Sequence, residues 1–352
     1  MSLLRHIILT GLLFLEAVTF IGCSRLVDED LTACAPEFDV DYELMLVTNL
    51  QTELETVLDV QTDIAVSGAL KEHYEGIFTD FAHDVDLSFY DTTGPMGRLE
   101  HLQEIMNASQ TSYALHLPGR DYQHLCVANL SGDPTITLEG DEFCNTARLV
   151  QHPSVQDTVE AHTSGIFTAR QQIYVQTDID QTFNVSLYMV NAATSLVLDI
   201  SEAPGVKDVR VIVTGFADSF SLADSTYHFD TTPIVRTQRV ATENASELCF
   251  ASVHFPSRGI SSPETKMTID TDEPFPDEYS ENSLWEWRVY TTLDNNTITE
   301  TTLEVHSPLR AGQFKVVKGR VRLDGGVDTN DQYVGASVAL DWHPGAEHDI
   351  DL

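Results

Sequence analysis

The chain has 352 residues, and its 55 Asp and Glu residues outnumber its 19 Lys and Arg residues, so the formal net charge is −36. Nucleic acids and anionic membrane surfaces attract cationic faces, and this charge therefore argues against both as partners of the protein surface. Hydrophobic residues make up 42% of the chain, which is enough for a sizeable core. The length is typical of about two domains.

The N-terminus has the pattern of an export signal. An apolar stretch at residues 7–21 follows Arg5 and ends just before Cys23. It is shorter than the roughly 20 residues of a membrane span and has the layout of a secretory signal peptide. Its ending, Phe20-Ile21-Gly22-Cys23, resembles a bacterial lipobox, in which the cysteine is acylated after cleavage. We therefore expect a signal peptide at 1–22 with Cys23 as the lipidation site; an ordinary signal peptide with an incidental cysteine is the alternative.

A short leader follows the expected cleavage site. Residues 23–36 should form a lipidated leader, and its acidic run at 28–30 resembles the surface-export signal of lipoproteins in Bacteroidetes-type Gram-negative anaerobes. A solvated tether is the other reading of the same run. The expected location is the outer membrane, lipid-anchored and surface-exposed.

Apolar residues then alternate with polar ones along most of the chain, which is the period of a β-strand. The alternation predicts strands, in chain order, at 38–46, 85–89, 113–117, 183–189, 196–200, 209–213, 285–289 and 334–342. Turn signals such as Gly94-Pro95 and Gly325-Gly326 separate them. Short strands with one polar face favour antiparallel sandwiches, in which one face of each sheet is solvated.

Two helices interrupt this pattern in the first half. A stripe at helical spacing predicts a helix over 67–82, formed by Leu70, Tyr74, Ile77, Phe78 and Phe81. A weaker pattern at 98–107 predicts a second helix through Leu99, Leu102, Ile105 and Met106. We expect the first helix to pack on an N-terminal β-sandwich domain at 37–168. A C-terminal β-sandwich domain should follow at 169–352, with the junction near 163–172.

The cysteines allow several pairings. If Cys23 carries a lipid, Cys34, Cys126, Cys144 and Cys249 remain in an oxidising compartment. Four cysteines have three complete pairings, and the sequence does not choose among them. Cys126 and Cys144 flank a turn with Gly and Pro and are the candidate disulfide. Cys249 lies in a strand pattern, which also suits a buried free thiol.

Sequence motifs of common catalytic and metal sites are absent. The chain contains no G-x-S-x-G, H-E-x-x-H, P-loop or G-x-G-x-x-G sequence. We therefore expect no catalytic, metal or cofactor-binding residues and no enzyme. Acidic residues at 270–278 could offer oxygen ligands to calcium, but they lack the EF-hand pattern and fit a solvated loop better. Trp285 and Trp287 share one strand face, where core packing is favoured over a sugar-stacking platform.

Several segments behind the lipobox resemble FimB-type fimbrillin-anchoring lipoproteins. The matching segments are Asp30–Pro36, Asp84–Asp91, Tyr113–Gly119 with Tyr122, Asn129-Leu130, Gly165–Phe167, Phe183–Met189, Val213–Ala217, Asp224–Tyr227 and Asp341–Gly345. Ala35 stands where this family often has a proline directly after the cysteine, and the insertion at 48–83 is the least similar part. The resemblance implies a mainly β chain of two tandem antiparallel transthyretin-like β-sandwich domains, with one or two short helices in the first.

The resemblance also implies a function. Members of this family hold fimbriae (pili) in the outer membrane through a covalent lipid and limit fimbrial length. The expected partners are fimbrillin shaft subunits, bound by strand exchange, and not nucleic acid. The final strand, Tyr333 to Trp342, is a candidate exchanged strand with an inward set of Val334, Ala336, Val338, Leu340 and Trp342. The alternatives are that this strand completes its own domain, and that the protein is a glycan-binding surface lipoprotein of a polysaccharide-uptake system or a fimbrial tip adhesin.

Overall fold

The structure is a computed structural model. It describes residues 37–47, 57–59, 61–79, 82–105, 112–154, 157–176, 179, 181–260, 279–332 and 334–342. The described chain is mainly β, as predicted, with strands in four sheets and one twelve-residue helix, α3 (Ile64–Glu75). Among these residues, none of the helical segments has the length and apolar character needed to cross a bilayer.

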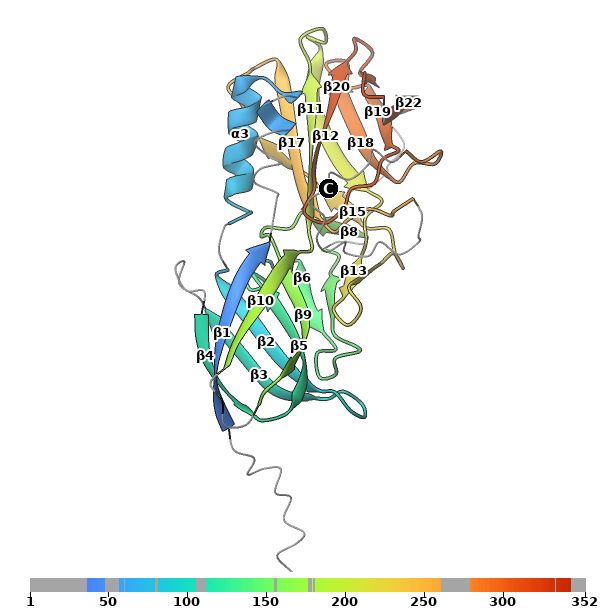
Figure 1. Cartoon of the computed structure of the whole chain (residues 1–352). Helices are drawn as coiled ribbons and strands as arrows, with labels where there is room; N and C mark the ends of the chain where they lie inside the picture. Colours follow the sequence, from blue (N-terminus) through green and yellow to red (C-terminus); the bar gives the residue numbers. More distant parts are fainter. Residues whose placement is uncertain are drawn as a thin grey trace, which may run out of the picture.

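A seven-stranded sheet forms the lower sandwich in Figure 1, in the order β3-β2-β5-β9-β10-β1-β4. Its strands are β1 (Glu37–Val47), β2 (Asp84–Asp91), β3 (Arg98–Ile105), β4 (Ser112–Pro118), β5 (Asp121–Ala128), β9 (Phe167–Tyr174) and β10 (Gln181–Met189). β9 and β10 pair at only two positions, and the sheet folds there into two layers. Tyr42 of β1 reaches across to bond His124 of β5, so the inward side chains of both layers share one core.

Two further sheets face each other in the upper sandwich. The five-stranded sheet has the order β16 (Gln238–Val240), β17 (Glu247–His254), β11 (Ala192–Asp199), β20 (Phe314–Val321) and β21 (Val327–Asp328). The six-stranded sheet has the order β22 (Val334–Trp342), β19 (Ile298–Val305), β18 (Trp285–Leu293), β12 (Val206–Thr214), β15 (Ile234–Arg236) and β8 (Thr158–Glu160). Leu196 and Leu198 of one sheet and Trp285 and Trp287 of the other belong to the core between them.

The sheets are mixed rather than purely antiparallel. Three pairs of described strands run parallel: β1 with β10, β11 with β20, and β8 with β15. Strands of a parallel pair need a long crossover instead of a hairpin, and the members of each pair here are far apart in the sequence. Side chains alternate in the same way in both kinds of ladder, so the period of two did not specify strand direction.

A small four-stranded sheet connects the two sandwiches. It consists of β14 (Thr226–His228), β13 (Ser219–Ser221), β7 (Arg148–Gln151) and β6 (Ile136–Glu139). The central pairing of β7 with β13 joins strands from the two halves of the chain. Its core includes Tyr90 and Leu125, which lie on the outer face of the first sheet.

The helix packs on the second sandwich, and the expectation that it packs on the first is wrong. The Tyr74 hydroxyl donates to the carbonyl oxygen of Thr194 in β11 (2.8 Å), and its ring contacts Phe314 of β20. Figure 1 shows α3 beside β17 and β11, above the first sandwich. An apolar stripe requires a surface to cover it, but it does not say which sheet provides that surface.

The extent of this helix also differs from the prediction. α3 begins after Asp63, whose carboxylate accepts a hydrogen bond from Val66 N (2.9 Å), and it ends at Glu75, before Gly76. Leu70 and Tyr74 are fully buried and Ile77 nearly so, as predicted. Phe78 is partly buried and Phe81 lies outside the described residues.

The second predicted helix, at 98–107, is wrong, because residues 98–105 form strand β3. Leu, Glu and Gln favour a helix weakly, and here β2 supplies a ladder of partners that overrides this preference. Leu102 is opposite Leu87 in that ladder and packs against the core of the first sandwich.

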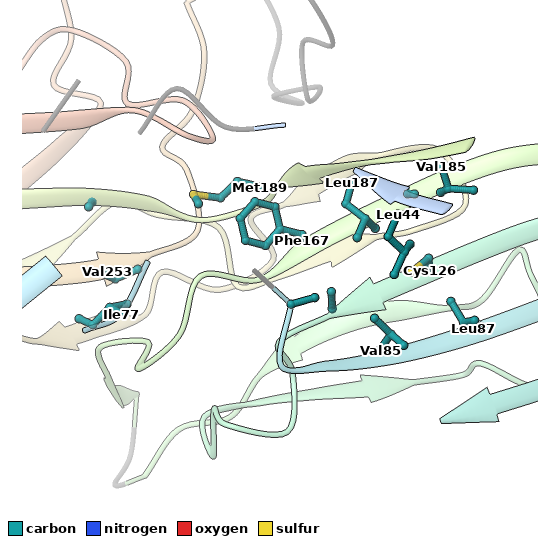
Figure 2. Packing of buried hydrophobic residues seen from close by; sticks show 14 of the residues in the cluster. Leu44, Ile77, Val85, Leu87, Cys126, Phe167, Val185, Leu187, Met189 and Val253 are labelled. Atoms are coloured by element: carbon teal, nitrogen blue, oxygen red, sulfur yellow. The ribbon is translucent and has the colours of Figure 1, made fainter. Parts of the chain in front are cut away.

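The chain passes from the first sandwich to the second between Met189 and Ala192, where β10 ends and β11 begins. However, β6 and β7 from the first half of the chain share a sheet with β13 and β14 from the second half. The sheets therefore do not define a single residue at which one domain ends and the next begins. The domain limits predicted around 163–172 therefore stay a prediction. One apolar cluster continues through this region, as Figure 2 shows with Leu44, Phe167 and Met189 from the first sandwich, Ile77 after α3 and Val253 from β17.

Candidate functional site

The predicted lipidation site lies outside the described residues. Cys23 and the leader at 23–36 are not among them, and neither are the acidic residues at 270–278. Acylation of Cys23 and calcium binding by the acidic loop are therefore untested by the structure. Within the described ranges, no group of three or more His, Cys, Asp or Glu side chains is arranged to hold a metal ion.

The candidate disulfide between Cys126 and Cys144 is not formed, which corrects the sequence prediction. Both cysteines are buried free thiols, as is Cys249. Cys126 is on β5 in the core of the first sandwich, whereas Cys144 belongs to the core under the small sheet. The two side chains therefore lie in different cores, on opposite faces of the layer that contains β5. Their proximity in sequence does not bring the two sulfur atoms together.

The tryptophan pair is part of the core. Trp285 and Trp287 are 1% and 0% exposed, and they pack with the inward residues of the second sandwich. The indole nitrogen of Trp285 donates to the carbonyl oxygen of Ser307 (2.9 Å). A sugar-stacking platform needs exposed aromatic faces, so these two residues do not supply one.

A hollow of about 590 Å³ lies on the outer face of the five-stranded sheet. Val197 and Val316 are apolar residues in its lining, and Lys318 and Arg320 line it together with Glu247. Burial and the nearby carboxylates of Asp63 and Asp199 raise the pKa of Glu247. The lining combines charges of both signs without an aromatic surface, and it does not single out one class of ligand.

Three histidines are fully buried among the described residues: His124, His162 and His254. Burial lowers the pKa of His124 and His162 to about 4 and that of His254 to about 3. The Nδ1 of His124 donates to the carbonyl oxygen of Ser88 (3.0 Å), so its Nε2 is the acceptor for the Tyr42 hydroxyl. An acid–base pair of this kind needs access for a substrate, and both side chains are closed off inside the core. The pair is structural.

Asn191 lies where the chain passes from the first sandwich to the second, and its hydrogen bonds connect this point to other segments. Its side-chain oxygen accepts from Ile166 N (2.6 Å), and its side-chain nitrogen donates to Nδ1 of His162 (2.7 Å). Its carbonyl oxygen accepts from Gly312 N (2.7 Å). Two separate segments, the stretch at 162–166 and the turn at Gly312, are therefore bonded to one buried residue. Sequence reasoning did not single it out because an isolated asparagine between two strands has no distinguishing pattern.

The final strand of the described chain completes its own sheet, which is the alternative left open by the sequence. β22 pairs with β19 from Val334 opposite Val305 to Trp342 opposite Ile298. Val334 is buried as predicted, whereas Ala336 is exposed, although it lies opposite the buried Leu303. An edge strand has a neighbour on one side only, which explains the exposure. The side chains at 338, 340 and 342 are outside the description.

Comparison with known proteins identifies the fold. No family model and no curated protein matches the chain. A candidate adhesin from Bacteroides ovatus has 11% sequence identity and a TM-score of 0.51, and the match covers 91% of this chain and 98% of that chain. The two proteins share a fold over nearly their whole lengths.

Two other solved structures align less closely. The fimbrial anchor protein Mfa2 from Porphyromonas gingivalis has 8% identity and a TM-score of 0.47, with 87% of this chain and 100% of that chain covered. Candidate polysaccharide-binding proteins from Bacteroides thetaiotaomicron have 8% identity and a TM-score of 0.48, with 84% of this chain and 97% of that chain covered. At these identities, a structural match describes the fold and not the function.

Proposed function

We propose that this protein is a non-enzymatic lipoprotein that anchors fimbriae in the outer membrane and limits their length. The observation that supports it most is the layout of the body. β1 begins at the end of the first sandwich that is remote from the second sandwich (Figure 1). A lipid on Cys23 would hold that end at the membrane, and the second sandwich would then project away from it.

The partners in this proposal are fimbrillin shaft subunits, joined to the anchor by an added strand. Strand addition suits a permanent mechanical joint, because a ladder of backbone hydrogen bonds forms along the whole strand. β22 is a nine-residue edge strand on the distal sandwich, and it ends the six-stranded sheet. Because β22 is paired with β19 on one side, its other edge meets the geometric requirement for accepting a strand, which supports its role at this joint.

One feature of the sequence and one of the structure support the anchor proposal. The ordered segments behind the lipobox resemble the FimB-type anchors, and the two tryptophans considered for a sugar platform are buried. A tip adhesin shares the sandwich architecture, so genetics must separate it from an anchor. Loss of an anchor detaches whole fimbriae, whereas loss of a tip protein leaves them attached.

The test is a gene deletion with complementation by two variants. Deleting the gene should shed fimbriae into the medium, some of them longer than normal, and the wild-type gene should restore attachment. Cys23→Ala should fail to restore it and should lose acyl labelling, whereas Cys34→Ala, which changes a second cysteine eleven residues later in the same leader, should restore it. Normal cell-bound fimbriae with loss of glycan binding in the deletion strain would replace the anchor by the glycan-binding alternative.

A further inference from the structure

Among the described residues, no strand pairs with the outer edge of β4. β4 is a seven-residue strand, Ser112–Pro118, at the end of the seven-stranded order, and its single strand neighbour among the described residues is β1. The β4–β1 ladder runs through all seven residues without a bulge. One row of backbone groups on β4 therefore faces away from its sheet.

This edge lacks the protection that most other edges of the described sheets have. Proteins usually block an open edge with charged side chains, bulges or very short strands. β3, at the opposite edge of the same sheet, contains Arg98, Glu100 and Glu104, and five other edge strands have four residues or fewer. β4 contains no Lys, Arg, Asp or Glu, and its inward Tyr113, Leu115 and Leu117 form a regular apolar row.

An acidic row lies one strand behind this edge, on the outer face of β1. The ladder sets Glu43 opposite Ser112, Asp41 opposite Ala114 and Asp39 opposite His116, and all six side chains are exposed. His116 Nδ1 lies 2.6 Å from an Asp39 carboxylate oxygen, and among the described residues no Lys or Arg forms an ion pair with this row. Ser112 and Ala114 are small, so long side chains from beyond β4 can reach the carboxylates behind them.

We propose that the β4 edge binds an extended segment of a partner protein in which apolar residues alternate with Lys or Arg. The backbone of that segment would continue the ladder, 4.7–4.9 Å beyond β4 as in any sheet. Its apolar residues would extend the row of Tyr113, Leu115 and Leu117, and its basic residues would lie over the acidic row. This surface is on the first sandwich and does not depend on the proposed fimbrial role.

The charge of the protein decides against a second copy as the occupant. Pairing of β4 with β4 of another copy would bring two acidic rows to the same face, and each copy has a formal charge of −36. The two rows would lie on one face with the two β4 strands between them, and their repulsion adds to that of two strongly acidic copies. A segment with Lys or Arg residues would instead be attracted by the same acidic residues.

The test uses two blocked, fluorescently labelled nonapeptides, one alternating Val with Lys and one alternating Val with Glu, and the full chain in detergent. Fluorescence anisotropy should show saturable binding of the Lys peptide only. Amide hydrogen exchange should then slow within 112–118. Equal binding of both peptides, or binding that leaves exchange at 112–118 unchanged, would overturn the proposal.

Two charge variants separate a local effect from attraction to the acidic protein as a whole. Ala114→Lys should weaken binding of the Lys peptide by up to about fivefold, and Ala114→Glu should strengthen it by a similar factor. Gln238→Lys and Gln238→Glu make the same charge changes on an exposed position of the second sandwich and should have little effect. Equal shifts at both positions, or a concentration-dependent dimer in sedimentation that Ala114→Lys abolishes, would refute it.

Discussion

Acidification should destabilise this protein through its three buried histidines. Burial holds the pKa of His124 and His162 at about 4 and that of His254 at about 3, below the ordinary value of 6.5. The unfolded chain therefore binds protons that the folded chain does not bind once the pH falls below 6.5. The stability contributed by the neutral histidines is complete above pH 6.5 and is lost as the pH falls toward the folded-state pKa values.

The size of the effect follows from these pKa values. At pH 5, a histidine that titrates at 6.5 when unfolded and at 4 or below when folded lowers the free energy of unfolding by about 2 kcal/mol. Three of them together lower it by about 6 kcal/mol, which compares with a total of about 5–15 kcal/mol for a typical domain. Protonation of carboxylates relieves repulsion in a chain of charge −36 and acts in the opposite direction.

Variants separate these two effects. Urea unfolding of the full chain, followed by tryptophan fluorescence, should be compared at pH 7.5 and pH 5.0 for wild type, His254→Gln and His162→Gln. Each variant should lose about 2 kcal/mol less than wild type between the two pH values. If His254→Gln and His162→Gln both show the wild-type pH dependence, the buried histidines do not titrate as argued.

Two further pairs of variants test stability, measured by thermal and urea unfolding. Tyr74→Phe should cost about 1–3 kcal/mol because it removes the buried contacts of the hydroxyl with the Thr194 carbonyl and the Ser195 hydroxyl, whereas Tyr113→Phe should be neutral or stabilising because its buried hydroxyl has no hydrogen-bond partner among the described residues. A larger loss for Tyr113→Phe than for Tyr74→Phe would contradict both. Gly215→Ala should destabilise severely, since φ is +103° and the new Cβ would lie 2.5 Å from a backbone atom of Trp285. Gly312→Ala, with positive φ but open space, should cost only about 1 kcal/mol, and equal losses would refute the steric argument.

Strand positions could be predicted from the sequence because each inward residue is buried on its own strand. The predicted strand at 113–117 is β4, and that at 285–289 lies within β18. Buried residues alternate with exposed ones along β4 and with half-buried ones along β18, in the same period as in the sequence. This agreement is local, since it requires only that one face of each strand be covered.

Long-range relations could not be predicted in the same way. The stripe of α3 identified a buried face correctly, but the surface that covers it belongs to β11, β17 and β20, more than 100 residues later in the chain. The strand at 98–105 has helix-forming residues, and only its ladder with β2 decides its conformation. Parallel pairing and the separation of Cys126 from Cys144 likewise depend on how distant segments meet.

The insertion at 48–83, which least resembles the FimB-type family, adds a further contact between the two sandwiches. α3 is connected to the first sandwich by sequence and packs on the second through Leu70 and Tyr74. Just beyond it, Gly165 N donates to the carbonyl oxygen of Ile77 (3.0 Å), and a Cβ on Gly165 would come within 2.7 Å of Phe78. A pull between the two ends of the molecule must therefore separate a buried helix face as well as the Asn191 crossing. Such a joint resists extension better than two domains on a single linker, which is the mechanical property that an anchor under load requires.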